Sequence, residues 1–84
     1  MRTIHIPGQV DRIGPIAGRS DGSYVLLLKG SSNMFVADGD NMAMGDKDTW
    51  GITMALTNPG DRVTVRVSEA KPNVIIGFDN HEFQ

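Results

Sequence analysis

With 84 residues, the chain has room for one hydrophobic core, so we expect residues 1–84 to form a single small domain. It contains no cysteine, which excludes a disulfide framework, a thiolate nucleophile and a cysteine zinc site. A net charge of −2 argues against broad, salt-driven adhesion to nucleic acid or anionic lipid. No stretch resembles a signal peptide or a membrane span, so we expect a cytoplasmic protein that does not enter a membrane.

The first half of the chain predicts short strands separated by turns, as its many Gly and Pro residues suggest. The predicted strands are residues 9–16, 24–28 and 34–37. In the first, Gly14-Pro15 predicts a bend or bulge. The run from Tyr24 to Leu28 carries apolar side chains on both faces, which is typical of a strand covered on both sides or partly exposed to a partner.

Residues 48–56 fit two periods. A strand would place Trp50, Ile52, Met54 and Leu56 on one face. A helix capped by Asp48 or Thr49 would turn Trp50, Ile52 and Met54 towards the core, although Gly51 and two Thr residues weaken it. The Pro-Gly turn that follows favours a short helix, because a helix before such a turn can join strands that are not neighbours in the sheet.

The last part of the chain predicts a hairpin. Val63, Val65 and Val67 alternate with polar residues, which indicates a strand with its valines facing inward. A turn over residues 69–73 leads to a partner strand over residues 74–78. The polar residues 79–84 are expected to fray.

Together these elements predict a mainly β fold: a small five-stranded antiparallel barrel, OB-like or SH3-like, with one short helix or turn between strands 3 and 4. The element order resembles that of barrels of the oligonucleotide-binding type. The stretch from Gly60 to Gly77, with its Val-x-Val-x-Val run, is similar to strand pairs of SH3-like barrels and of the carbon-storage-regulator RNA-binding family. This pattern is common to many small β proteins, so it assigns no functional residues.

The stretch 38–48 is acidic, with four Asp against one Lys and a local charge of −3. Because clustered charge steers association and methionine forms adaptable contact surfaces, we interpret it as a protein-binding loop. The candidate partner-binding residues are Asp38, Asp40, Met42, Met44, Asp46 and Asp48. The stretch lacks the spacing of a calcium loop, so no metal site is predicted there.

A second hypothesis is single-stranded nucleic-acid binding, in which bases stack on aromatic rings and cations follow phosphates. It requires cations and rings to share one face. The candidate residues are Tyr24, Lys29, Phe35, Trp50, Arg62 and Arg66.

We predict no enzyme, because a nucleophile motif and a phosphate-binding glycine loop are both missing from the sequence. Asp79, His81 and Glu82 form only a partial acid/base or metal set, and His5 is distant in sequence, so no metal or cofactor site is predicted. The leading functional prediction is a non-enzymatic module for protein interaction or self-association, through the acidic loop or an exposed strand edge.

Overall fold

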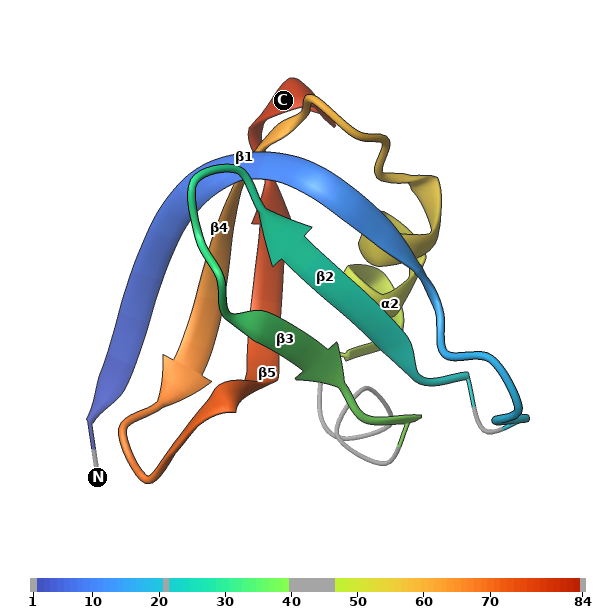
Figure 1. The fold of residues 1–84 in the computed structure, drawn as a ribbon, viewed down its shortest axis with the longest axis horizontal. Coiled ribbons are helices and arrows are strands. Elements are labelled where there is room, and N and C mark those ends of the chain that lie inside the picture. The colour runs from blue at the N-terminus through green and yellow to red at the C-terminus, as the bar shows by residue number, and fades with distance from the viewer. Residues whose placement is uncertain (1, 21, 40–46, 84) are drawn as a thin grey trace.

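The computed structural model describes residues 2–20, 22–39 and 47–83, with only the backbone described at 47–49. The fold is a closed five-stranded β-barrel with one short helix between strands 3 and 4, as the sequence predicts (Figure 1). The elements are β1 (Thr3–Pro15), β2 (Tyr24–Leu28), β3 (Met34–Ala37), α2 (Lys47–Leu56), β4 (Arg62–Ser68), β5 (Lys71–Asn80) and the 3₁₀ helix η1 (His81–Phe83).

The strands follow one another around the barrel in the order β1-β2-β3-β5-β4. Four of the five junctions are antiparallel, but β3 and β5 run parallel and meet at the pair Val36↔Val74. The prediction of a purely antiparallel barrel is therefore wrong at this junction. The reason is the odd number of strands: strand direction alternates at each antiparallel junction, so a closed ring of five strands must contain a parallel one.

Strand β1 begins six residues before the predicted start at residue 9, and it curves around the barrel (Figure 1). Its first half pairs with β4 and its second half with β2. Ile4, Ile6 and Val10 keep the two-residue period of a strand, but Pro7-Gly8 resembles a turn and hides it in the sequence. Gly8 continues the inward face, where an added Cβ would lie 2.9 Å from Leu28 Cδ1, so Leu28 occupies the space of its missing side chain.

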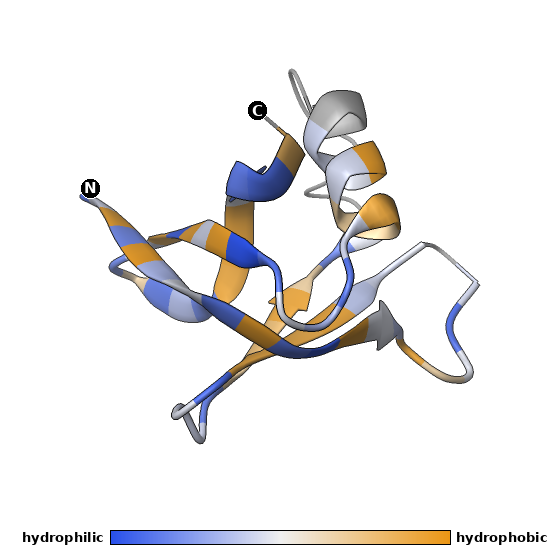
Figure 2. Ribbon diagram, turned by 90° about the horizontal axis from the view of Figure 1, so that it is seen from above, coloured by the Kyte–Doolittle hydropathy of each residue, from blue (hydrophilic) through white to orange (hydrophobic). Residues whose placement is uncertain are grey.

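The hydrophobic core fills the interior of the barrel. Val63, Val65 and Val67 are at most 1% exposed, which confirms that the valines of β4 face inward. Opposite them, Ile75 pairs with Val67 and Phe78 with Val65. Figure 2 shows the resulting alternation of hydrophobic and hydrophilic bands along the strands.

Residues 47–56 form a helix, as favoured by the sequence. Trp50 and Met54 are 8% and 1% exposed, whereas Ile52 and Leu56 are more than half exposed. This spacing of buried residues at i and i+4 is the helical period. In the described part of the chain, no helix is long and apolar enough to cross a membrane.

Strand β5 extends beyond its predicted bounds at both ends, because it starts at Lys71 and ends at Asn80. Pro72 and Asn73, predicted as a turn, lie where its pairing with β4 is interrupted. The end of the chain is also more ordered than predicted: residues 81–83 form η1 instead of fraying, and side-chain hydrogen bonds attach this helix to β4 and β5.

Candidate partner-binding face

An apolar surface covers the outside of β2 and β3, which form the front wall of the barrel in Figure 1. On β2, Leu26 and Leu28 are buried while Val25 and Leu27 are half-buried. On β3, Phe35 and Ala37 are buried, Val36 is half-buried and Met34 is 52% exposed. Since successive side chains of a strand point to opposite faces, the less buried set lies on the outer surface of the barrel. We call this surface, with Val74 of β5, the β2–β3 face; its residues are Val25, Leu27, Met34, Val36 and Val74.

The strand register places these side chains side by side. Val25 pairs with Val36 and Leu27 with Met34, so each pair shares one face of the sheet at the distance of a direct cross-strand contact. Val74 extends the row across the parallel junction with Val36. The face is therefore a continuous aliphatic surface that spans three strands.

Two cations border the face. Arg12 pairs with Leu27 across the β1–β2 junction and is exposed. Lys29 follows the end of β2, where its backbone N–H donates to the Gln9 carbonyl at 2.8 Å, and it is also exposed. Within the described ranges, neither side chain has a carboxylate at ion-pair distance. The border of the face thus carries two cations that form no ion pair with a described carboxylate.

Most of the predicted acidic loop lies outside the described residues. The candidate residues concerned are Asp40, Met42, Met44 and Asp46. Asp48 belongs to the backbone of α2, and its side chain is not described. Asp38 follows β3 and is half-buried, and its neighbour Gly39 donates its backbone N–H to Ser23 Oγ at 3.0 Å. The acidic protein-binding loop therefore stays a prediction.

The three aromatic residues predicted to stack on bases do not gather on an outer face. Phe35 and Trp50 are buried in the core at 3% and 8% exposure. Tyr24 is half-buried and packs against the core from the inward side of β2. The shared surface of rings and cations that the nucleic-acid hypothesis requires is therefore not formed by Phe35 and Trp50.

The three predicted cations lie on different parts of the barrel. Lys29 borders the β2–β3 face, whereas Arg62 and Arg66 are on the outer surface of β4. Arg66 lies across Gly77 of β5, where an added Cβ would be only 2.5 Å from its Nε, and this nitrogen is 3.6 Å from Asp79 Oδ2. Because Gly77 has no side chain, the guanidinium of Arg66 can lie against the backbone of β5.

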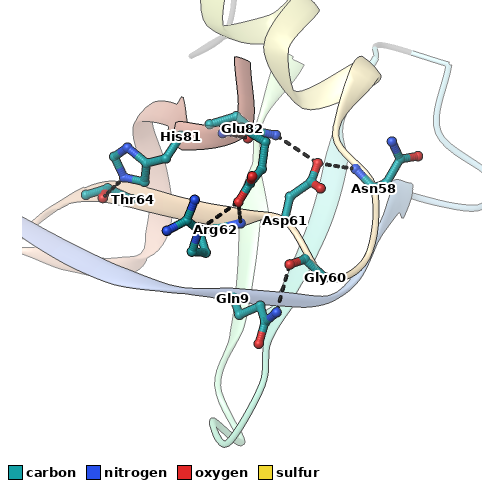
Figure 3. A network of polar contacts seen from close by, with 9 residues as sticks. Gln9, Asn58, Gly60, Asp61, Arg62, Thr64, His81 and Glu82 are labelled. Atoms are coloured by element: carbon teal, nitrogen blue, oxygen red, sulfur yellow. Dashed lines mark hydrogen bonds and ion pairs between the residues drawn. The ribbon is translucent and has the colours of Figure 1, made fainter. Parts of the chain in front are cut away.

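Arg62 belongs to a polar network that closes one end of the barrel (Figure 3). Its Nε and its backbone N–H both donate to Glu82 Oε2, at 2.8 and 3.1 Å. Beside them, Asp61 Oδ2 accepts from the Asn58 N–H at 3.0 Å and from Asn80 Nδ2 at 3.1 Å. These contacts hold η1 against the turn before β4, so the role of the network is to stabilise this end of the fold.

The partial acid/base set at the end of the chain is divided among separate partners. Asp79 pairs with Arg66, Glu82 with Arg62, and His81 Nε2 lies 2.7 Å from Thr64 Oγ1. Among the described residues, no group of three or more His, Cys, Asp or Glu could hold a metal ion.

The Arg62–Glu82 pair predicts a pH-dependent stability. The hydrogen bond from the Arg62 side chain lowers the pKa of Glu82 below its usual value and raises the pKa of Arg62. A carboxyl whose pKa is lower in the folded state stabilises the fold above its unfolded pKa, and this contribution disappears as the pH falls through the folded pKa. We therefore expect Glu82→Gln to lower the melting temperature slightly at pH 7 and not at all in strong acid.

Thermal unfolding of both proteins between neutral and acidic pH measures this difference. Because both side chains are exposed, added salt should reduce it. A difference between the two melting temperatures that stayed constant at every pH would contradict the role of the Glu82 charge.

Sequence reasoning missed the β2–β3 face as a surface, although one signal for it was visible. The run from Tyr24 to Leu28 is apolar at every position, and it was interpreted as covered on both sides or open to a partner. Met34 gives no such signal, because an isolated methionine is more typical of a core. Arg12 was missed since its place beside Leu27 depends on the bulge in β1.

Comparison with known proteins adds no family or activity: the chain matches no protein-family model, no curated protein and no solved structure.

Proposed function

We propose that this protein is a non-enzymatic binding module that holds a protein partner on the β2–β3 face. The observation that carries the proposal is the row of aliphatic side chains on the outside of β2, β3 and β5, of which Met34, 52% exposed, is the most exposed. Contiguous apolar surface outside a barrel is costly in water, and such patches on small proteins mark interaction sites. An apolar centre with a charged border is also the usual anatomy of a protein interface.

The closed barrel favours this face over a strand edge as the contact. Each strand has a neighbour on both sides around the ring, so no strand is left wholly unpaired at an edge. The first half of β1 pairs with β4, and Pro7 in its middle has no N–H to offer a further strand. Strand addition would therefore have to use the open side of the first half of β1 or the junction of β3 with β5, which meet at one residue pair.

Substitution on the face tests the proposal. Met34→Glu should abolish recovery of a specific partner in affinity capture from a lysate of the source cells, because it replaces the most exposed apolar side chain of the face with a charge. Ile52→Glu on α2 is the matched control, since Ile52 is 61% exposed but belongs to a different surface. Circular dichroism must show that both variants keep the β fold.

The expected result is a partner that binds the wild type and Ile52→Glu but not Met34→Glu. Equal recovery by all three proteins would remove the face from the function.

Single-stranded nucleic-acid binding is a second candidate, supported by the strand order. A closed barrel in the order β1-β2-β3-β5-β4, with a helix between β3 and β4, agrees with the oligonucleotide-binding type of barrel, in which the outer surface of strands 2 and 3 binds the ligand. In this chain that surface carries aliphatic side chains in place of stacking rings, and Arg62 and Arg66 are paired with carboxylates. These features make it the weaker candidate.

Titration with labelled single-stranded DNA and RNA separates the two candidates. Nucleic-acid binding should appear first at low salt, because releasing counterions from phosphates drives it. Absence of binding at low salt would eliminate the second candidate and leave the first unaffected.

A further inference from the structure

The cations of the barrel wall fall into two groups. Three arginines each lie beside a carboxylate: Arg2 with Glu69 at 3.9 Å, Arg62 with Glu82 at 2.8 Å, and Arg66 with Asp79 at 3.6 Å. Arg12 and Lys29, at the border of the β2–β3 face, and Lys71, at the start of β5, have no such partner in the described part of the chain. Two of these three cations thus lie beside the aliphatic face, in a protein whose net charge is −2.

We propose that the occupant of the β2–β3 face is a protein segment that combines aliphatic side chains with carboxylates; this rests on the proposed function. The aliphatic side chains of the partner bury Val25, Leu27 and Met34, while its carboxylates meet Arg12 and Lys29 at the border. Complementary charge of this kind steers the encounter and excludes basic competitors.

Two other occupants fit the face less well. A second copy related by two-fold symmetry would bring the same surface against itself, so that Arg12 and Lys29 of both copies would crowd one interface. A nucleic-acid strand would satisfy the two cations with phosphate, but the outward positions of the face offer its bases no aromatic ring to stack on.

The probes for the test are short fluorescein-labelled peptides, one of alternating Leu and Glu and one of alternating Leu and Lys, with labelled oligothymidine as a third. Fluorescence anisotropy at about 20 mM and about 200 mM salt brackets the range over which exposed charges are screened. We expect the Glu peptide to bind at least about tenfold more tightly than the Lys peptide at low salt, and salt to narrow this ratio.

Charge reversal then locates the effect. Arg12→Glu combined with Lys29→Glu should weaken binding of the Glu peptide about tenfold. Arg2→Glu combined with Lys71→Glu is the matched control, because both side chains are exposed and this double reversal changes the net charge by the same amount. It should leave the affinity unchanged, and all variants should keep the melting temperature of the wild type within a few degrees.

Three results would overturn the inference: equal binding of the Lys peptide and the Glu peptide, binding of oligothymidine that the double reversal of Arg12 and Lys29 abolishes, or a dimer in light scattering that Met34→Glu dissociates.

Failure of this inference can be distinguished from failure of the proposed function. If the captured partner is lost on Met34→Glu but keeps its affinity for the double reversal, the acidic class is wrong and the binding face stands. If neither change affects recovery, both proposals fail.

Discussion

Val65→Asp is expected to unfold the protein. Val65 is 0% exposed and pairs with Phe78 inside the barrel, so the variant would bury a carboxylate with no partner. The penalty for a buried unpaired charge is several kcal/mol, which approaches or exceeds the roughly 4–12 kcal/mol by which a domain of this length is stable. Circular dichroism at room temperature should show loss of the β signal, and thermal scans should show no cooperative transition.

Val25→Asp is the matched control, because it makes the same chemical change on the outer side of the barrel wall. Val25 is half-buried on the β2–β3 face, where the new carboxylate keeps access to water. We expect a loss of about 1 kcal/mol, seen as a fall of about 4–8 °C in melting temperature. If Val65→Asp unfolded at the temperature of the wild type, the inward orientation of β4, and with it the barrel, would be wrong.

Replacing Asn80 is expected to release the end of the chain from the barrel. Asn80 is 4% exposed, and its Nδ2 donates to Thr57 Oγ1 and Asp61 Oδ2 while its Oδ1 accepts the Glu82 N–H. Asn80→Ala removes these contacts and leaves their partners poorly satisfied, at a cost of about 2–4 kcal/mol in unfolding free energy. Urea denaturation measures this loss.

Asn80→Asp distinguishes a lost hydrogen bond from a lost volume, because it keeps the shape of the side chain. The introduced group cannot donate to Asp61 while it is ionised, so two carboxylates would share one hydrogen-bonding position. Repulsion and burial raise the pKa of the introduced group above its unfolded value, so the folded state binds an extra proton and the variant regains stability as the pH falls. Asn80→Ala should show no such recovery in acid relative to the wild type.

Adding Asp61→Asn to Asn80→Asp restores one donor and one acceptor at this position. The double variant should be more stable than Asn80→Asp at pH 7, and the double-mutant cycle gives the coupling between the two side chains. If the second change brought no recovery of stability, the Asn80–Asp61 hydrogen bond would not contribute to the free energy of unfolding.

Where a segment is covered on one side only, its own residues predict its structure. Val63, Val65 and Val67 alternate without exception, and burial of one face of β4 is enough to specify that pattern. The helix α2 was less clear from the sequence, because residues 48–56 also fit the period of a strand and only the following Pro-Gly turn favoured a helix. Ile52, expected to face the core in that helix, is 61% exposed, because only Trp50 and Met54 keep the helical spacing towards the barrel.

Other features could not be read locally, because the side chains that explain them come from elsewhere in the chain. Gly8 is tolerated inside β1 because Leu28 takes up its space, and Gly77 allows Arg66 to cross β5. Residues 79–83 look free to fray, yet Asn80 and Glu82 bind groups about 20 residues earlier in the chain. The candidate site follows the same rule, since Arg12 lies beside Leu27 only through the pairing of β1 with β2.

The sequence by itself predicted a β-rich barrel and the inward face of β4, and it favoured a helix over a strand before the closing hairpin, because hydrophobic period and turn residues act over short distances. Only the tertiary structure decided the parallel contact of β3 with β5, the reach of β1, and which apolar residues remain outside the core. These depend on closing the barrel: once its interior is full, Val25, Leu27 and Met34 are left on the outer surface.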